Sequence, residues 1–136
     1  MNRLPGTISA IEMHGSIALV DVAVGDHRFS ATLIGAGDEI GTWTPGMAVV
    51  LLFKETEVSL AKNLSGLISM RNRLPCTIST IERGQVLTRV GLDLDGHRIE
   101  SIITTRSSHA LELAVGDAVE GLVKANEMTL VPEADA

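Results

Sequence analysis

The stretch NRLPGTISAIE at residues 2–12 returns as NRLPCTISTIE at residues 72–82, with nine of the eleven positions identical. The offset of 70 residues continues beyond this stretch and pairs Lys54 with Lys124. A register kept over about sixty residues indicates an internal repeat. Further pairs at the same offset are His27 with His97, Gly46 with Gly116, Glu57 with Glu127 and Leu60 with Leu130.

The repeat predicts two copies of one small domain, about 1–61 and 68–133, joined by a short polar stretch at 61–66. A domain of about 65 residues buries a limited share of its surface when it folds alone. We therefore expect the two copies to pack together, or several chains to associate, and so to bury more apolar surface.

Each copy is predicted to form β structure. In the second copy, apolar and polar residues alternate over 86–95, which is the period of a strand with one buried face. Asp95-Gly96 is typical of a two-residue hairpin turn, in which both residues take positive φ. The expected return strand covers 98–105; the first copy is predicted to have a strand over 20–24, a turn at Gly25-Asp26 and a return strand over 28–34.

The rest of each copy predicts a small barrel. A short helix is expected in SSHALELAVGD at 107–117, whereas GAGDEIGTWTPGM at 35–47 is too rich in glycine to predict one. Two more strands are expected in each copy, near 47–54 and 57–61, and near 118–124 and 127–131. Five short strands with a helical insertion after the third predict an all-β chain of two tandem, five-stranded, OB-like barrels.

Composition excludes several classes of protein. The 136 residues are 45% hydrophobic and 21% charged, which predicts a folded rather than a disordered chain. No apolar run reaches the roughly 20 residues of a membrane span, and the N-terminus has no signal-peptide pattern, so we expect a cytoplasmic protein. The net charge of −6 and the scarcity of aromatic residues argue against nucleic-acid binding.

No catalytic or metal-binding motif is found in the sequence. Cys76 is the single cysteine, and no pair of the four histidines has the spacing of metal ligands. There is no glycine-rich phosphate loop. Ser107 and Ser108 precede His109, but adjacent residues of a helical turn face different ways, which argues against a serine nucleophile with a histidine base. We predict a protein that is not an enzyme and has no catalytic cofactor.

A set of hydroxyl and cationic side chains distinguishes the second copy from the first. It comprises Ser69 and Arg71 before the repeated stretch, Thr104 and Ser107 after the third strand, and Lys124. Hydroxyls, an arginine and a lysine that converge on one point would suit a tetrahedral oxyanion, and backbone N–H groups at the start of a helix would add donors. The alternative is that Thr104 and Ser107 only cap the helix and that Arg71 and Lys124 are solvated.

Three segments of the second copy resemble the Mop domain, the molybdate-binding module of the molbindins. They are SMRNRLPCTISTIERG, ITTRSSHALELAVGDAV and GLVKANEMTLV, in that order along the chain. Because the resemblance covers both copies, it implies a tandem Mop protein with an OB-like fold. It further implies binding of molybdate and tungstate, and a symmetric homo-oligomer with sites between neighbouring modules, a trimer or alternatively a dimer.

The resemblance also implies the residues of the site. One wall is formed by Ser69, Arg71 and the backbone of Met70, and the other by Thr104, Ser107 and Lys124, contributed by a different module or chain. In the first copy, Ile34 and Gly37 occupy the positions of the two hydroxyl residues, and the Ser-x-Arg element is missing. Only Lys54 corresponds to a site residue there, and it is a possible secondary site.

The resulting hypothesis is reversible molybdate or tungstate binding for molybdenum storage and homeostasis. The alternative is a structural or protein-interaction OB module whose anion site is vestigial. Binding of nucleic acid through the OB surface is a third reading, which the charge and the few aromatic residues disfavour.

Overall fold

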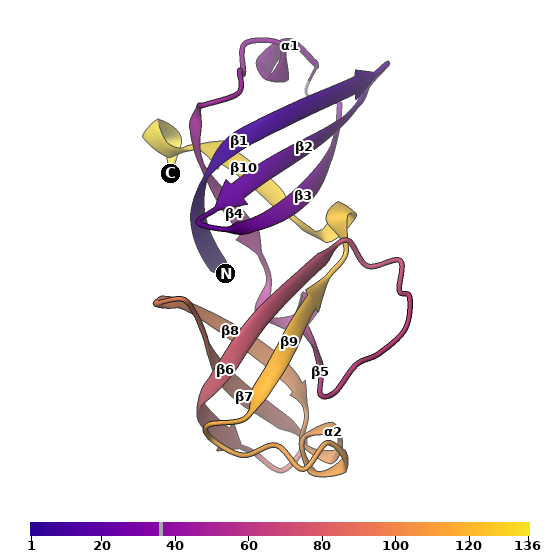
Figure 1. The fold of residues 1–136 in the computed structure, drawn as a ribbon, viewed down its shortest axis with the longest axis vertical. Coiled ribbons are helices and arrows are strands. Elements are labelled where there is room, and N and C mark those ends of the chain that lie inside the picture. Colours follow the sequence, from indigo (N-terminus) through magenta and orange to yellow (C-terminus); the bar gives the residue numbers. More distant parts are fainter. Residues whose placement is uncertain (36) are drawn as a thin grey trace. The chain divides into compact units, whose positions relative to one another are not determined.

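A computed structural model of the chain describes residues 1–35 and 37–136 (Figure 1). Ala36, in the glycine-rich segment of the first copy, lies outside the described residues. The elements of the first copy are β1 (Asn2–His14), β2 (Ile17–Val24), β3 (His27–Ile34), α1 (Gly37–Ile40), β4 (Ala48–Phe53), the 3₁₀ turn η1 (Glu55–Glu57) and β5 (Ser59–Ala61).

The second copy repeats this order. Its elements are β6 (Asn72–Arg83), β7 (Leu87–Leu94), β8 (His97–Thr104), α2 (Thr105–Ala110), β9 (Ala118–Val123), the 3₁₀ turn η2 (Ala125–Glu127) and β10 (Thr129–Pro132), followed by the 3₁₀ turn η3 (Glu133–Asp135).

The two copies exchange their closing strands. One sheet has the order β10-β4-β1-β2-β3, and the other has the order β5-β9-β6-β7-β8. The chain accordingly divides into unit 1, with Met1, Arg3–Phe53 and Lys124–Ala136, and unit 2, with Asn2 and Lys54–Val123. The last strand of each sequence repeat therefore belongs to the barrel of the other repeat, so the compact units differ from the repeats of the sequence.

The alternation of apolar and polar residues produces the strands as predicted. Along β7, the even-numbered residues from Thr88 to Leu94 are buried, and the odd-numbered ones are exposed except Gly91. The turn after it has φ of 48° at Asp95 and 90° at Gly96, which confirms the predicted hairpin. The long first strands β1 and β6 each shift register at a bulge, between Ile8 and Ala10 and between Ile78 and Thr80.

The helices differ from the sequence prediction in two respects. The glycine-rich segment of the first copy does form one helical turn, α1, so the prediction of no helix there was wrong; Ile40 anchors the turn, with only 2% of its surface exposed. In the second copy, α2 begins at Thr105 rather than at Ser107. The reason is that the Thr104 side chain caps the helix by accepting a hydrogen bond from the Ser107 amide.

Each unit has its own apolar core. In unit 1, Leu4, Val20, Phe29 and Leu51 are at most 1% exposed, and Leu130 of the exchanged β10 is 3% exposed. In unit 2 the fully buried residues include Leu74, Val90, Leu92, Ile99 and Val123. The exchanged strand β10 therefore contributes Leu130 to the core that it enters.

Lys62, in the segment between the copies, fastens the far end of α2. Its ammonium donates to the carbonyls of Leu111 at 3.2 Å and Glu112 at 3.0 Å, and to the Asp117 carboxylate at 3.0 Å. The hydrogen bond from Lys62 lowers the pKa of Asp117. Among the described residues, no helix has the length and apolar composition needed to span a membrane.

Candidate functional site

Thr104 and Ser107 lie side by side at the junction of β8 and α2. The Thr104 hydroxyl donates to the Ser107 Oγ at 2.8 Å and accepts from the Ser107 amide at 3.1 Å. The backbone N–H of Ser107 is thus not a free donor, contrary to the sequence expectation. Since Ser107 Oγ accepts the Thr104 proton, the Ser107 hydroxyl proton remains available to a ligand.

The space beside Thr104 is open. A cavity of about 440 Å³ is lined by Gln85, Val86, Thr104 and Arg106. The Arg106 side chain forms no hydrogen bond or ion pair with the described part of the chain. Thr104 and a solvated guanidinium therefore border the same hollow of unit 2, whereas Ser107 lines a separate cavity of about 220 Å³ on the side of Thr56 and Leu111.

The second predicted group of site residues lies at the start of β6. Ser69, Met70 and Arg71 form the irregular segment before this strand, and the side chains of Ser69 and Arg71 are exposed. The first residue of β6, Asn72, pairs with the last residue of β9, Val123. Arg71 and Lys124 are each one residue away from this pair, so the chain brings two exposed cations to the same end of the sheet.

These two groups are at opposite ends of unit 2. At its far end β6 pairs Arg83 with Thr88 of β7, and Thr88 pairs with Ile103, next to Thr104. A strand rises about 3.3 Å per residue, so the twelve residues of β6 span up to about 36 Å. Figure 1 shows β6 running from the end of β9 toward the end of the unit that carries α2. Within unit 2, Ser69 and Arg71 therefore cannot bind the same small ion as Thr104 and Ser107.

Lys54, the possible secondary site, lies in unit 2, directly before η1. This turn packs against β8, and the carbonyl of Val58 accepts a hydrogen bond of 2.6 Å from Ser101. From Val58 onward the chain advances toward α2, because Lys62 reaches the carbonyl of Leu111.

The first copy carries no hydroxyl pair at the equivalent place. The strand register confirms the equivalence, because Ile17 pairs with Ile34 as Leu87 pairs with Thr104. Ile34 is 74% exposed, and Gly37 begins α1. Unit 1 therefore presents an apolar side chain where unit 2 presents a hydrogen-bonding one.

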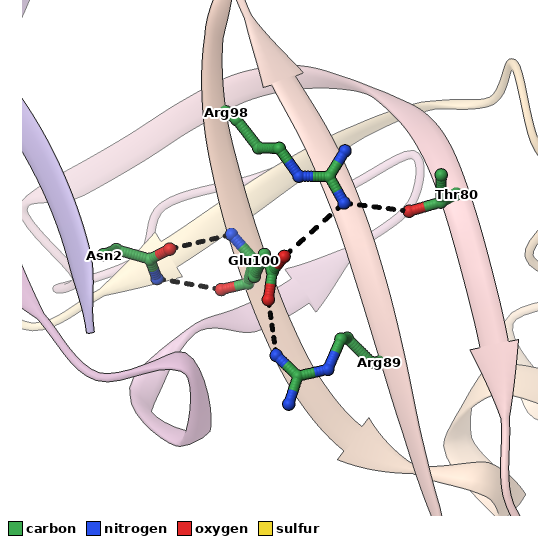
Figure 2. Close-up of polar contacts among 5 residues, drawn as sticks. All are labelled: Asn2, Thr80, Arg89, Arg98 and Glu100. Carbon is green, nitrogen blue, oxygen red and sulfur yellow. Dashed lines mark hydrogen bonds and ion pairs between the residues drawn. The ribbon is translucent and has the colours of Figure 1, made fainter.

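The asparagine of the repeated NRLP stretch has a role that the sequence analysis missed. The Asn2 amide donates to the carbonyl of Glu100 at 2.8 Å and accepts from the amide of Glu100 at 2.8 Å, as Figure 2 shows. This side chain thereby pairs with the edge strand β8 as a neighbouring strand would. The sequence signal for this role was the repetition of the asparagine at the same position of both copies, as Asn2 and Asn72. In the structure Asn72 is also fully buried.

Two arginines beside this contact are already neutralised. Arg89 and Arg98 both bind the carboxylate of Glu100, which lies between them in Figure 2, and Arg98 also donates to Thr80 at 3.3 Å. The hydrogen bond to Glu100 raises the pKa of Arg89. These arginines therefore differ from Arg71, which has no acidic partner among the described residues.

The remaining reactive groups of the described chain do not form a site. Cys76 is 5% exposed, and burial raises the pKa of its thiol to about 12, so it is a poor nucleophile and metal ligand. Residues 1–35 and 37–136 contain no cluster of three or more histidine, cysteine or acidic residues that could hold a metal ion.

Comparison with protein families gives one match that covers both copies. The model of the TOBE domain matches residues 1–60 and 68–130. The molybdenum import ATP-binding protein ModC of Brucella abortus (strain 2308) is 36% identical over 123 residues, which are 90% of this chain and 32% of ModC. The molybdenum transport protein ModE of Herbaspirillum seropedicae is 28% identical over 133 residues, which are 89% of this chain and 49% of ModE. The chain thus spans a third to a half of these two relatives.

A solved structure matches nearly the whole chain. The cytoplasmic molybdate-binding protein ModG, in a crystal form with molybdate bound, superimposes with a TM-score of 0.88 and 31% sequence identity. The match covers 95% of this chain and 94% of that one. The predicted fold, two tandem OB-like barrels with a short helix after the third strand of the second copy, is confirmed.

Proposed function

The chain belongs to the TOBE domain family, as a tandem protein of the molbindin type, and on that premise we propose that it binds molybdate, and also tungstate, reversibly. The proposed role is storage and homeostasis of molybdenum in the cytoplasm. No bond of the anion is made or broken, so the protein is not an enzyme. The observation that carries the proposal is the likeness to molybdate-bound ModG, which covers 95% of this chain and 94% of that one.

We propose that one site is built from two half-sites on different copies of the chain. The cationic half-site comprises Ser69, the Met70 backbone, Arg71 and Lys124, and the hydroxyl half-site comprises Thr104 and Ser107. Lys124 is grouped here with Arg71, because the adjacent residues Asn72 and Val123 pair, and not with Thr104 and Ser107 as the resemblance implies. The length of β6 supports this division, because within unit 2 it separates Ser69 and Arg71 from Thr104 and Ser107 by much more than the reach of one anion. A second copy must then bring the complementary half-site.

Exposed apolar residues next to both half-sites support an association of this kind. Leu67 is fully exposed and Ile68 is 40% exposed, directly before Ser69. Val86 is 73% and Leu87 is 55% exposed, and Leu87 pairs with Thr104. Contact between copies at the half-sites would bury these side chains, and buried apolar side chains are typical of an interface core.

We expect a homo-oligomer, with three chains as the leading number and two as the alternative. Light scattering at micromolar concentration, with and without molybdate, measures the mass. Leu87→Lys places a charge beside Thr104 and is expected to lower the mass, because a buried unpaired charge disfavours association. A monomeric wild-type protein in both conditions would contradict shared sites.

We expect selectivity for the larger oxyanions. Molybdate, tungstate and sulfate are tetrahedral dianions that accept the same hydrogen bonds, so the size of the cage must separate them. Calorimetric titration is expected to show tight binding of molybdate and tungstate and weak binding of sulfate. Equal affinity for sulfate would contradict selection by the size of the cage. The absence of a binding heat with all three anions would favour the alternative of a structural module with a vestigial site.

A further inference from the structure

A network of polar side chains, of which Thr88 and Ser108 are fully buried, lies beneath the turn that carries Thr104 and Ser107. The Thr105 hydroxyl donates to the carbonyl of Gly84 at 2.8 Å, and it lies 2.8 Å from the Thr88 hydroxyl. Each hydroxyl has one proton, so Thr88 must be the donor to Thr105. Thr88 is fully buried, in the middle of the unit rather than at its surface.

A second branch of the network fixes the next residues of α2. Arg83 donates to the Ser108 hydroxyl at 3.1 Å and to the carbonyl of Leu113 at 2.8 Å. The fully buried Ser108 in turn donates to the carbonyl of Thr105 at 2.7 Å. The two branches meet at Thr105, the residue directly after Thr104.

None of these polar groups is present in the first copy. Arg83 pairs with Thr88 across the hairpin of β6 and β7, and Met13 pairs with Ala18 across the hairpin of β1 and β2. Met13 and Ala18 therefore occupy the positions of Arg83 and Thr88 in the first copy. The same offset places Gly35 and Asp38 at the positions of Thr105 and Ser108. The network therefore occurs only in the copy that has the hydroxyl half-site, although the backbone bond from residue 105 to Val86 has its counterpart from Gly35 to Ser16.

We propose that Arg83, Thr88, Thr105 and Ser108 form a positioning network for anion binding, which holds the Thr104 and Ser107 hydroxyls in the orientation that the anion requires. The proposal rests on the proposed function. A helix of six residues is too short to be rigid by itself, so its orientation depends on these side-chain contacts. If the network served only stability, we would expect it in unit 1 as well. Unit 1 forms the same strands and turn without it.

The test compares variants that delete buried hydroxyls in the two units. Thr88→Val keeps the shape of the side chain and removes the hydrogen bond to Thr105, and it is expected to weaken molybdate binding about tenfold, as loss of outer partners of ligating groups does elsewhere. Thr88→Ser restores the hydroxyl and is expected to bind like the wild type. Ser30→Ala is the matched control, because Ser30 is buried in unit 1 and donates to Asp21 at 2.6 Å.

Thermal unfolding and calorimetric titration are measured for each variant. Thr88→Val and Ser30→Ala are both expected to lower Tm, but only Thr88→Val is expected to change the affinity for molybdate. Unchanged affinity in Thr88→Val, or equal losses in Thr88→Val and Ser30→Ala, would overturn the positioning role. Arg83→Met, which introduces the residue of the first copy at an exposed position, gives the same test if Thr88→Val does not fold. Failure of the wild-type protein to bind molybdate would instead reject the proposed function.

Discussion

Replacement of Lys124 by alanine is expected to weaken molybdate binding by about tenfold to a hundredfold. Hydrogen bonds to charged groups contribute roughly 1.5–3 kcal/mol, and each 1.4 kcal/mol is about a factor of ten in affinity. The loss follows because a dianion in a partly desolvated cage would be left with one cation fewer. The dissociation constant from calorimetric titration, at fixed salt, measures the effect.

Lys54→Ala is the control for Lys124→Ala. Both lysines precede a 3₁₀ turn, η1 or η2, and neither side chain has a hydrogen-bonding partner in the described part of the protein. Lys124 is next to the start of β6 with Ser69 and Arg71, whereas in the copy of Lys54 the position of Arg71 is occupied by Met1. Lys54→Ala is therefore expected to change the affinity little. Equal losses in the two variants would show that the first copy also holds a site.

Two variants that bind molybdate weakly are expected to form tight sites when they are co-expressed. Arg71→Ala disables the cationic half-site, and the double variant Thr104→Val/Ser107→Ala disables the hydroxyl half-site. If each site joins half-sites of different chains, random mixed oligomers should recover about a quarter of the wild-type sites. The number of tight sites per chain, measured by titration of the purified mixture, tests this expectation.

The matched control is a mixture of Arg71→Ala with Lys124→Ala. Both substitutions damage the same half-site, so no pairing of the two chains produces an intact site and no recovery is expected. If the first mixture also fails to recover while its mass remains that of the wild-type oligomer, each site lies within one chain and the division into half-sites is wrong.

Much of the fold could be predicted because it depends on local patterns. The repeat itself, the alternating strands and the Asp95-Gly96 turn each follow from neighbouring residues, and the structure confirms them. The family could also be predicted, because its three motifs are contiguous segments. These segments do not indicate which end of the barrel each of them occupies.

The Thr104 cap of α2 was one of the two alternatives that the sequence left open, whereas the polar network beneath the helix could not be predicted from these patterns. Thr104 caps the helix because its hydroxyl meets the Ser107 amide, which shifts the start to Thr105. The bond from Arg83 to Ser108 joins residues that are 25 positions apart, on a strand end and a helix. Such a contact depends on how β6 and β8 are placed across β7, and no short window of sequence contains it.

The sequence by itself determined two equivalent β modules and the chemical character of the site, hydroxyls and cations in the second copy. Only the tertiary structure decided that β5 closes the barrel of the second copy and β10 that of the first. The physical reason is the similarity of the copies: VSLA at 58–61 and MTLV at 128–131 have the same alternation, so either segment satisfies the open edge of either barrel. Equivalent local interactions cannot choose between the two closures, and the choice depends on the connected chain as a whole.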